Sequence, residues 1–377
     1  MKIRVIALLG FFAFTVTCLS PVRAGEGKIP VWMPTGITQP GHYIVTRDIS
    51  ASAGPVISIM ADGVTLDLNG HTIASSDMTQ PTIQIGGAPG SERGIIVVGG
   101  KVQGGLHGVL YLNPIIGNQP LSLAGLTIAG TTAAAVKGVG FSQLSAKGII
   151  VIDGLVGFDL QASAPGIPPP PVPPTATIRG AGIRGDGGVL CYGVSCSIHD
   201  MTFEYAPPSA APRSPALRFS GVTGAEAAGI IIINTAPSAA DPPMVEVLET
   251  CWLTLSRTKL VGPAAGSQPC IALDAASRDF IIDDGDVSRC GGDGIRALGT
   301  NGRIRGMFIS GVAGHGVFAG GSNLIIDDGK IADSDGAGIW FETSNHIYRD
   351  NILRGNTGGG VGGPGAADAT DAGGNVE

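Results

Sequence analysis

Apolar and polar residues alternate along many short segments of this chain. In the stretch DGVTLDLNGHTI (62–73), Val64, Leu66 and Leu68 alternate with polar residues. Alternation of this kind places one row of side chains in the core and the other in solvent, as in a half-buried β-strand. Further apolar bursts follow at residues 95–98, 121–123, 149–152, 176–178, 198–203 and 230–233. The pattern predicts many short strands joined by tight turns.

The C-terminal part of the chain repeats with a fixed period. The motif Gly-x-Gly followed by an aliphatic residue begins at Gly292, Gly314, Gly336 and Gly358, in steps of 22 residues. A unit of this size cannot bury its apolar face alone, but stacked units form one continuous core. The alternative architectures are an antiparallel sandwich and a β-propeller. A propeller needs about 40–50 residues per repeat, so the period disfavours it. We predict an all-β parallel β-helix of roughly a dozen coils between residues 56 and 361.

Four segments also resemble a known family. They are GHYIVTRDIS (41–50), VISIMADGVTLDLNGHTI (56–73), GIWFETSNHI (338–347) and YRDNILRGN (348–356). They resemble bacterial secreted right-handed parallel β-helix repeat proteins of the pectate-lyase-like superfamily, over most of residues 41–361. The resemblance implies a right-handed solenoid. It leaves the activity open, because this fold carries lyases, hydrolases, epimerases and noncatalytic proteins.

The two ends of the chain differ from the repeat. Residues 1–24 have a basic start, an apolar run and the small-residue site VRA, which together predict a signal peptide and a secreted or periplasmic protein. The apolar run is too short for a membrane span of about 20 residues. We expect residues 25–55 to cap the first coil. Residues 362–377 lack apolar periodicity and are expected to form a flexible tail.

Three proline-rich stretches interrupt the coils. They are residues 165–174, 206–215 and 236–243. Proline cannot donate to a strand ladder, so these stretches are predicted to loop out of the solenoid. Insertions of this kind either build the wall of a groove or form rigid solvated loops.

Charge and cysteine content narrow the classes of partner. The chain has a formal charge of -7, and removal of residues 1–24 takes away three basic residues and no acid. An acidic chain argues against nucleic acid as a partner, and binding of an acidic polysaccharide would need a local basic patch. Five cysteines follow the signal peptide, so at least one stays unpaired. Cys191 with Cys196 and Cys270 with Cys290 are two options for disulfides in an oxidising compartment.

The strongest candidate for a site includes the tripeptide Gly-His-Gly at residues 314–316, which polygalacturonases also contain. Inverting glycoside hydrolysis uses two carboxyl groups. A site like that of polygalacturonases needs them on neighbouring coils. The coil before His315 offers only Asp293. Polygalacturonases also carry an Asn-Thr-Asp motif upstream, but here Asn234-Thr235 is followed by alanine. The motif set of that family is therefore incomplete.

The 22-residue register nevertheless gathers chemically capable side chains. It places Asp293 beside His315, a pair suited to general base chemistry. It also aligns Arg296, Phe318 and Trp340 in one outward column, where aromatic rings can stack on sugars and Arg can pair with carboxylates. The predicted catalytic residues are Asp293 and His315, and the predicted substrate-binding residues are Arg296, Phe318, Trp340 and Glu342.

Two function classes follow from this candidate site. One is an enzyme on extracellular polysaccharide, namely a lyase, an epimerase or a glycoside hydrolase. The other is a noncatalytic carbohydrate-binding or structural surface protein.

Calcium is the only cofactor that the sequence suggests. A second column, Asp284, Arg305, Asp328 and Asp350, offers carboxylates to such an ion. Ordinary turn chemistry explains the same residues, since each precedes Gly or Asn.

Overall fold

A computed structural model describes residues 27–86, 94–112, 120–163, 172–205, 213–234, 241–262 and 266–377. The predicted signal peptide lies outside these residues, and so do most residues of the three proline-rich stretches. The described parts of those stretches, 172–174, 213–215 and 241–243, contain no strand, in agreement with their exclusion from the ladders.

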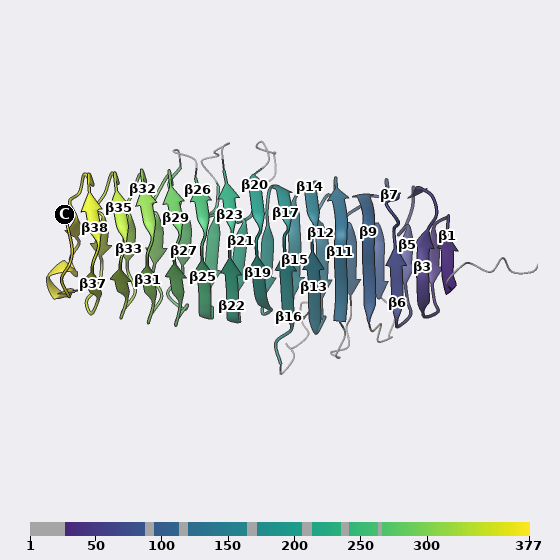
Figure 1. The fold of residues 1–377 in the computed structure, drawn as a ribbon, viewed down its shortest axis with the longest axis horizontal. Coiled ribbons are helices and arrows are strands. Elements are labelled where there is room, and N and C mark those ends of the chain that lie inside the picture. The colour runs from purple at the N-terminus through teal and green to yellow at the C-terminus, as the bar shows by residue number, and fades with distance from the viewer. Residues whose placement is uncertain are drawn as a thin grey trace, which may run out of the picture.

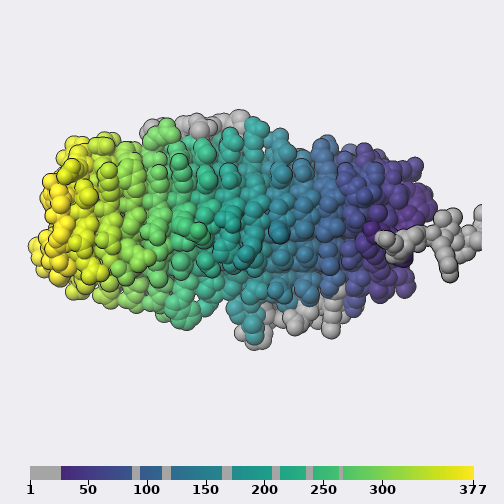
Figure 2. Space-filling model, viewed as in Figure 1, coloured from purple at the N-terminus to yellow at the C-terminus, as the bar shows by residue number. Residues whose placement is uncertain are grey.

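The chain winds into a long rod whose coils follow one another from end to end (Figures 1 and 2). Three ladders of parallel strands form its sides. Two of them belong to a single 26-stranded sheet, and the third is a separate 14-stranded sheet. The prediction of an all-β parallel solenoid with roughly a dozen coils is confirmed.

The first ladder comprises β1 (Lys28–Val31), β3 (Gly41–Val45), β6 (Val64–Asp67), β9 (Ile95–Gly104), β11 (Pro120–Ala129), β13 (Gln143–Lys147), β16 (Thr175–Arg179), β19 (Ser195–His199), β22 (Thr223–Ala228), β25 (Cys251–Ser256), β28 (Ile281–Asp283), β31 (Arg303–Arg305), β34 (Ile325–Asp327), β37 (Ile347–Arg349) and β40 (Thr370–Asp371). The second shares β9 and β11 and adds β4 (Ile49–Ala51), β7 (Thr72–Ser75), β14 (Ile150–Gly154), β17 (Gly182–Gly185), β20 (Thr202–Tyr205), β23 (Ile231–Ile233), β26 (Lys259–Val261), β29 (Asp286–Ser288), β32 (Phe308–Ser310), β35 (Lys330–Ala332) and β38 (Ile352–Arg354).

The 14-stranded sheet comprises β2 (Thr35–Ile37), β5 (Ile57–Ile59), β8 (Ile83–Gly86), β10 (Val109–Leu112), β12 (Ala134–Val139), β15 (Val156–Gln161), β18 (Val189–Tyr192), β21 (Leu217–Ser220), β24 (Val245–Leu248), β27 (Ile271–Leu273), β30 (Ile295–Ala297), β33 (Val317–Ala319), β36 (Ile339–Phe341) and β39 (Val361–Gly362). A short 3-10 helix, η2 (Ala366–Asp368), follows near the C-terminus.

Stacked aliphatic side chains hold successive coils together. Ile271, Ile295, Val317 and Ile339 align in consecutive strands of the 14-stranded sheet, and all four are fully buried. Each such side chain contributes about 1.5–3 kcal/mol through burial. The outward neighbours of these residues are therefore held in equally strict register.

Residues with left-handed backbone turn the chain at the corners. Asp279, Asn301 and Asn323 occupy equivalent corners with φ near +55°. Asp and Asn tolerate this region better than other residues with a side chain. The Asn301 amide donates to Asp279 Oδ1 at 3.2 Å, and the Asn323 amide donates to Asn301 Oδ1 at 3.2 Å. The corners thus stack as regularly as the strands.

Both ends of the rod differ from the predicted cap and tail. Strand β1 pairs with β3, and β2 pairs with β5, so residues 28–51 already form a coil rather than a separate cap. At the other end, β40 pairs with β37, and Val376 forms a bridge with Ile352. The tail therefore closes the last coil. The sequence suggested a flexible segment because two-residue strands carry no visible periodicity.

The cysteines adopt both of the pairings that the spacing left open. Cys191 is bonded to Cys196 and Cys270 to Cys290, while Cys251 is a half-buried free thiol. In the described part of the chain, no helix has the length and apolar character needed to cross a membrane.

His346 is a buried titratable group in the last coils. Its Nδ1 accepts the Leu324 backbone N–H at 3.4 Å, and its ring stacks on Phe341 with centroids 5.0 Å apart. Burial lowers its pKa below the ordinary value, against the opposing effect of the hydrogen bond with Thr343. A depressed histidine pKa means that the unfolded chain binds the proton more readily, so stability is complete above about pH 6.5 and falls below it.

We predict that the guanidinium denaturation midpoint falls between pH 7.5 and pH 5.0. His346→Asn should flatten this dependence, since the Asn oxygen can replace Nδ1 as an acceptor without titrating. Denaturation curves of both proteins at several pH values test the expectation, with the half-buried His42→Asn as a control. An unchanged slope in His346→Asn would show that another group governs the acid response.

Candidate functional site

The predicted outward column lies on the 14-stranded sheet. Arg296 on β30 pairs in register with Phe318 on β33, and Phe318 pairs with Trp340 on β36. The Arg296 side chain is 47% exposed, and its guanidinium carbon lies 4.7 Å from the centre of the Phe318 ring. This is a cation–π contact across one coil step. We call Arg296, Phe318, Trp340 and His315 the aromatic strip.

Trp340 is held in place on both sides. Its ring stacks on His315 with centroids 4.7 Å apart and planes inclined by 25°. On the next coil Gly362 occupies the equivalent position, and a Cβ there would lie 3.3 Å from the indole. Glycine therefore leaves room for the ring to lie against the sheet. The indole N–H donates to Glu342 at 2.9 Å, which orients the plane of the ring.

Asp293 lies beside His315 but bonds to its backbone. Asp293 Oδ1 accepts the His315 backbone N–H at 2.8 Å, and Oδ2 lies 3.8 Å from the Arg296 guanidinium. The residue is 8% exposed. The His315 ring turns toward the next coil instead, where Nδ1 accepts the Ala337 N–H at 3.0 Å. The register predicted that the two residues would be neighbours, but the contact that forms serves the backbone of the turn.

The column considered for calcium is displaced by one residue. Arg305 aligns with Asp283 and Asp327, not with the corner residues Asp284 and Asp328. Arg305 donates to Asp283 at 2.9 Å, so this carboxylate already has a guanidinium partner. The described residues contain no group of three or more His, Cys, Asp or Glu side chains arranged to hold a metal ion.

Asp327 in the same ladder is almost fully buried. It accepts hydrogen bonds from Arg303 and Arg349. Burial opposes its ionisation, but these two guanidinium groups outweigh burial and lower its pKa. It serves as the centre of an ion-pair network rather than as a free ligand.

A second polar cluster lies on the outer face of the 14-stranded sheet, further along the rod from the aromatic strip. The sequence did not reveal it. Lys137 pairs with Asp159 at 3.0 Å, and Arg218 donates to Glu246 at 2.6 Å. The Tyr192 hydroxyl accepts from Arg218 at 3.2 Å. A shallow depression of about 470 Å³ lies here, between β15 and β18, and Tyr192 forms part of its lining.

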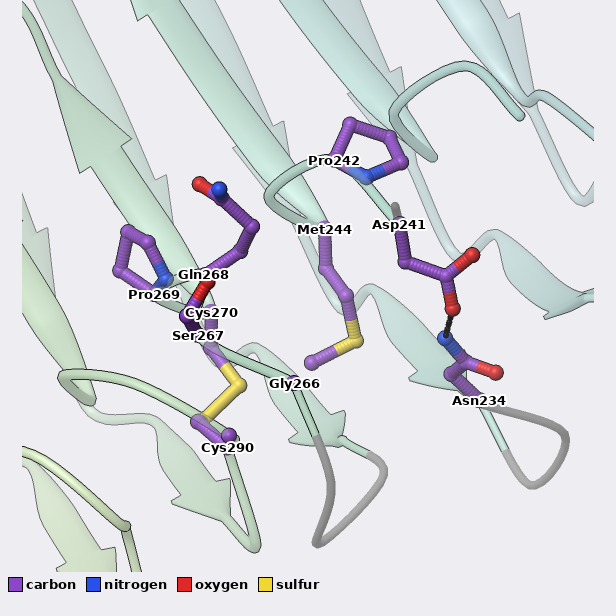
Figure 3. A pocket seen from close by; sticks show the side chains of 11 residues that line it. Asn234, Asp241, Pro242, Met244, Gly266, Ser267, Gln268, Pro269, Cys270 and Cys290 are labelled. Atoms are coloured by element: carbon purple, nitrogen blue, oxygen red, sulfur yellow. Dashed lines mark hydrogen bonds between the residues drawn. A yellow bond between two sulfur atoms is a disulfide. The ribbon is translucent and has the colours of Figure 1, made fainter. Parts of the chain in front are cut away.

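A small cavity lies where the chain enters β24 and β27 (Figure 3). Its lining includes Met244, the disulfide of Cys270 and Cys290, and Asp241, whose carboxylate accepts the Asn234 amide at 3.0 Å. Its volume of about 20 Å³ is close to that of a single water molecule. It is too small to admit a sugar.

Arg213 gives this region a buried ion pair. Its side chain is 3% exposed and contacts Asp241 at 2.9 Å. A buried guanidinium needs a partner of this kind, because the cost of removing its hydration is several kcal/mol. Arg213 and Asp241 are described residues of two different proline-rich stretches, so the pair joins residues that lie 28 positions apart in the sequence.

Residues 245–365 match the family model described as "Right handed beta helix region". Together with the strand pairing, the match shows a right-handed parallel β-helix, which is the fold that the resemblance in the sequence implied. No specific enzyme family is matched. No curated protein matches the chain.

Solved structures with a similar course of the chain include two polysaccharide-acting enzymes. One is the catalytic domain of a GH87 alpha-1,3-glucanase in complex with tetrasaccharides, with TM-score 0.40, 12% identity and 93% of this chain covered. The chain spans 64% of the length of that domain. The other is the Azotobacter vinelandii mannuronan C-5 epimerase AlgE6 A-module, with TM-score 0.40, 15% identity, and coverage of 94% of this chain and 91% of the module.

The His315 ring offers a direct test of the chemistry at the strip. Because Nδ1 accepts the Ala337 N–H, the neutral ring must carry its proton on Nε2, where it can donate but not accept. We predict the Nε2–H tautomer at neutral pH, visible in nitrogen-15 correlation spectra of the folded protein. A Nδ1–H tautomer would contradict this geometry and leave Nε2 free to act as a base.

Proposed function

We propose that the protein binds a polysaccharide along the outer face of the 14-stranded sheet without cleaving it. The main observation behind this proposal is that the ionisable groups at the aromatic strip already make hydrogen bonds within the protein. Asp293 is bonded to the His315 backbone, Glu342 to the Trp340 indole, and His315 Nδ1 to Ala337. The planar groups of the strip, in contrast, face outward.

The strip has the chemical character of a sugar-binding surface. Trp340 and Phe318 are half-buried, so each is held firmly while part of its surface remains open. Aromatic rings of this kind provide apolar contact with little loss of conformational entropy on binding. Neighbouring parallel strands are about 4.8 Å apart, so the strip presents a planar group at each coil step. A polymer of rings lying along the rod meets such a surface repeatedly.

Catalysis is the less favoured alternative. A lyase, an epimerase or a glycoside hydrolase needs a group that can take up or release a proton at the substrate. The acid and imidazole groups at the strip already serve as acceptors for protein N–H groups. We therefore place noncatalytic carbohydrate binding ahead of enzyme action. The signal peptide predicted in residues 1–24 favours the periplasm or the cell exterior as its place.

Trp340→Ala tests the proposal. We expect binding to a retained polysaccharide to weaken about tenfold or more, which corresponds to about 1.4 kcal/mol. Affinity gel electrophoresis against a panel of neutral and uronic polysaccharides provides the measurement. Trp252→Ala is the matched control, because Trp252 is 62% exposed on the first ladder, away from this face.

Equal weakening by both tryptophan variants would argue against a specific strip. Release of reducing ends or of unsaturated uronic products by the native protein would overturn the noncatalytic assignment. In that case Asp293→Asn should be assayed next, since this change retains a hydrogen-bond acceptor for the His315 N–H while removing the charge.

A further inference from the structure

We propose that the ligand is an uncharged glycan and that it occupies a second subsite at Gln161 and Tyr192. This inference rests on the proposed polysaccharide binding and extends it along the same sheet. The subsite is the shallow depression of about 470 Å³, which is lined by residues of strands β15 and β18 and of the segments that follow them.

The depression combines apolar and hydrogen-bonding groups. Ala162, Leu190 and Gly193 contribute small or apolar surface, while Asp159, Gln161 and Tyr192 contribute polar atoms. Sugars present both C–H faces and hydroxyl edges, and a lining of this mixed composition complements them. The subsite therefore has the composition expected for a saccharide rather than for an apolar ligand.

Hydrogen bonds inside the protein orient these polar groups. The Tyr192 hydroxyl accepts from Arg218, so its own O–H remains a donor for another partner. The Gln161 amide donates to Asp159 Oδ1 at 3.0 Å, which directs the amide plane and leaves its oxygen as an acceptor. A donor and an acceptor are thus fixed before a ligand arrives, and less entropy is lost when it binds.

The charges of this face argue against an acidic polymer. Among the described outward positions of the 14-stranded sheet, the cations are Lys137, Arg218 and Arg296. Each has a carboxylate within salt-bridge distance, namely Asp159, Glu246 and Asp293 respectively. A uronate would have to displace a protein carboxylate or lie close to one. A neutral glycan meets no such repulsion.

The two subsites lie on the same face of the rod but in neighbouring columns. Leu190 aligns with Arg218 and, through Glu246 and Ala272, with Arg296, and Tyr192 lies two positions further along β18. From β18 to β30 the sheet order passes through β21, β24 and β27. Four coil steps of about 4.8 Å place Tyr192 roughly 19 Å from the level of Arg296. One glycan of several units, lying along the rod axis, can contact both. Contacts at two linked subsites raise the affinity of a long chain above that of a short one.

Calorimetric titration with linear neutral gluco- and manno-oligosaccharides, from the disaccharide to the octasaccharide, tests the inference. Oligogalacturonides of the same lengths serve as the charged comparison. We expect neutral chains to bind with an affinity that rises with length. Tyr192→Ala should weaken octasaccharide binding about tenfold and leave trisaccharide binding at the aromatic strip unchanged.

Two variants keep this result interpretable. Gln84→Ala removes an outward amide from β8 on the same sheet, away from the depression, and should have no effect. Tyr192→Phe retains the ring and removes the hydroxyl, both as a donor to the ligand and as the acceptor of the Arg218 hydrogen bond, so it should fall between the native protein and Tyr192→Ala. Circular dichroism spectra of both Tyr192 variants, compared with that of the native protein, show whether a loss of binding comes from misfolding.

The outcomes separate this inference from the proposed function. Octasaccharide binding that depends on Trp340 but not on Tyr192 would overturn the second subsite and retain the proposed function. Tighter, salt-sensitive binding of oligogalacturonides would overturn the assignment to an uncharged glycan. Absence of binding to any member of either series would overturn the proposed function and the subsite together.

Discussion

The parallel pairing of each coil with the coil before it is the constraint on which the other features of this protein depend. Ile295, Val317 and Ile339 are aligned by backbone hydrogen bonds and are buried one above another. A slip of one residue would turn every inward side chain to the outside. The register is therefore fixed by the core, and the outward side chains follow it. Arg296, Phe318 and Trp340 form a column because their buried neighbours do.

This constraint explains how much of the molecule could be predicted from the sequence. Where the coils are 22 residues long, counting residues places Asp293 beside His315 and Phe318 beside Trp340, and the structure brings both pairs together. Counting does not determine which atom of a side chain is used. Asp293 contacts the backbone of residue 315 because the turn exposes an N–H there. The alignment of the column considered for calcium was wrong for a related reason, since it placed the corner residue Asp284 beside the strand residue Arg305.

The second polar cluster escaped the sequence analysis because the middle coils differ in length. Gln161 and Tyr192 are aligned although 31 residues separate them, and the next step to Ser220 takes 28 residues. The extra residues include the proline-rich stretches. A fixed period cannot align such coils. Only the pairing of the strands themselves shows that Lys137, Asp159, Tyr192 and Arg218 share one face.

The same regularity links stability to recognition in the C-terminal coils. His315 accepts a backbone N–H from the next coil with Nδ1 and supports the Trp340 indole with its ring. Asp293 steadies the turn that carries His315 and balances the charge of Arg296. Side chains with these structural duties are poor candidates for proton transfer, because changing their protonation would disturb the coil contacts they make. A surface whose ionisable groups are engaged in this way is consistent with the proposed binding of a polymer without its cleavage.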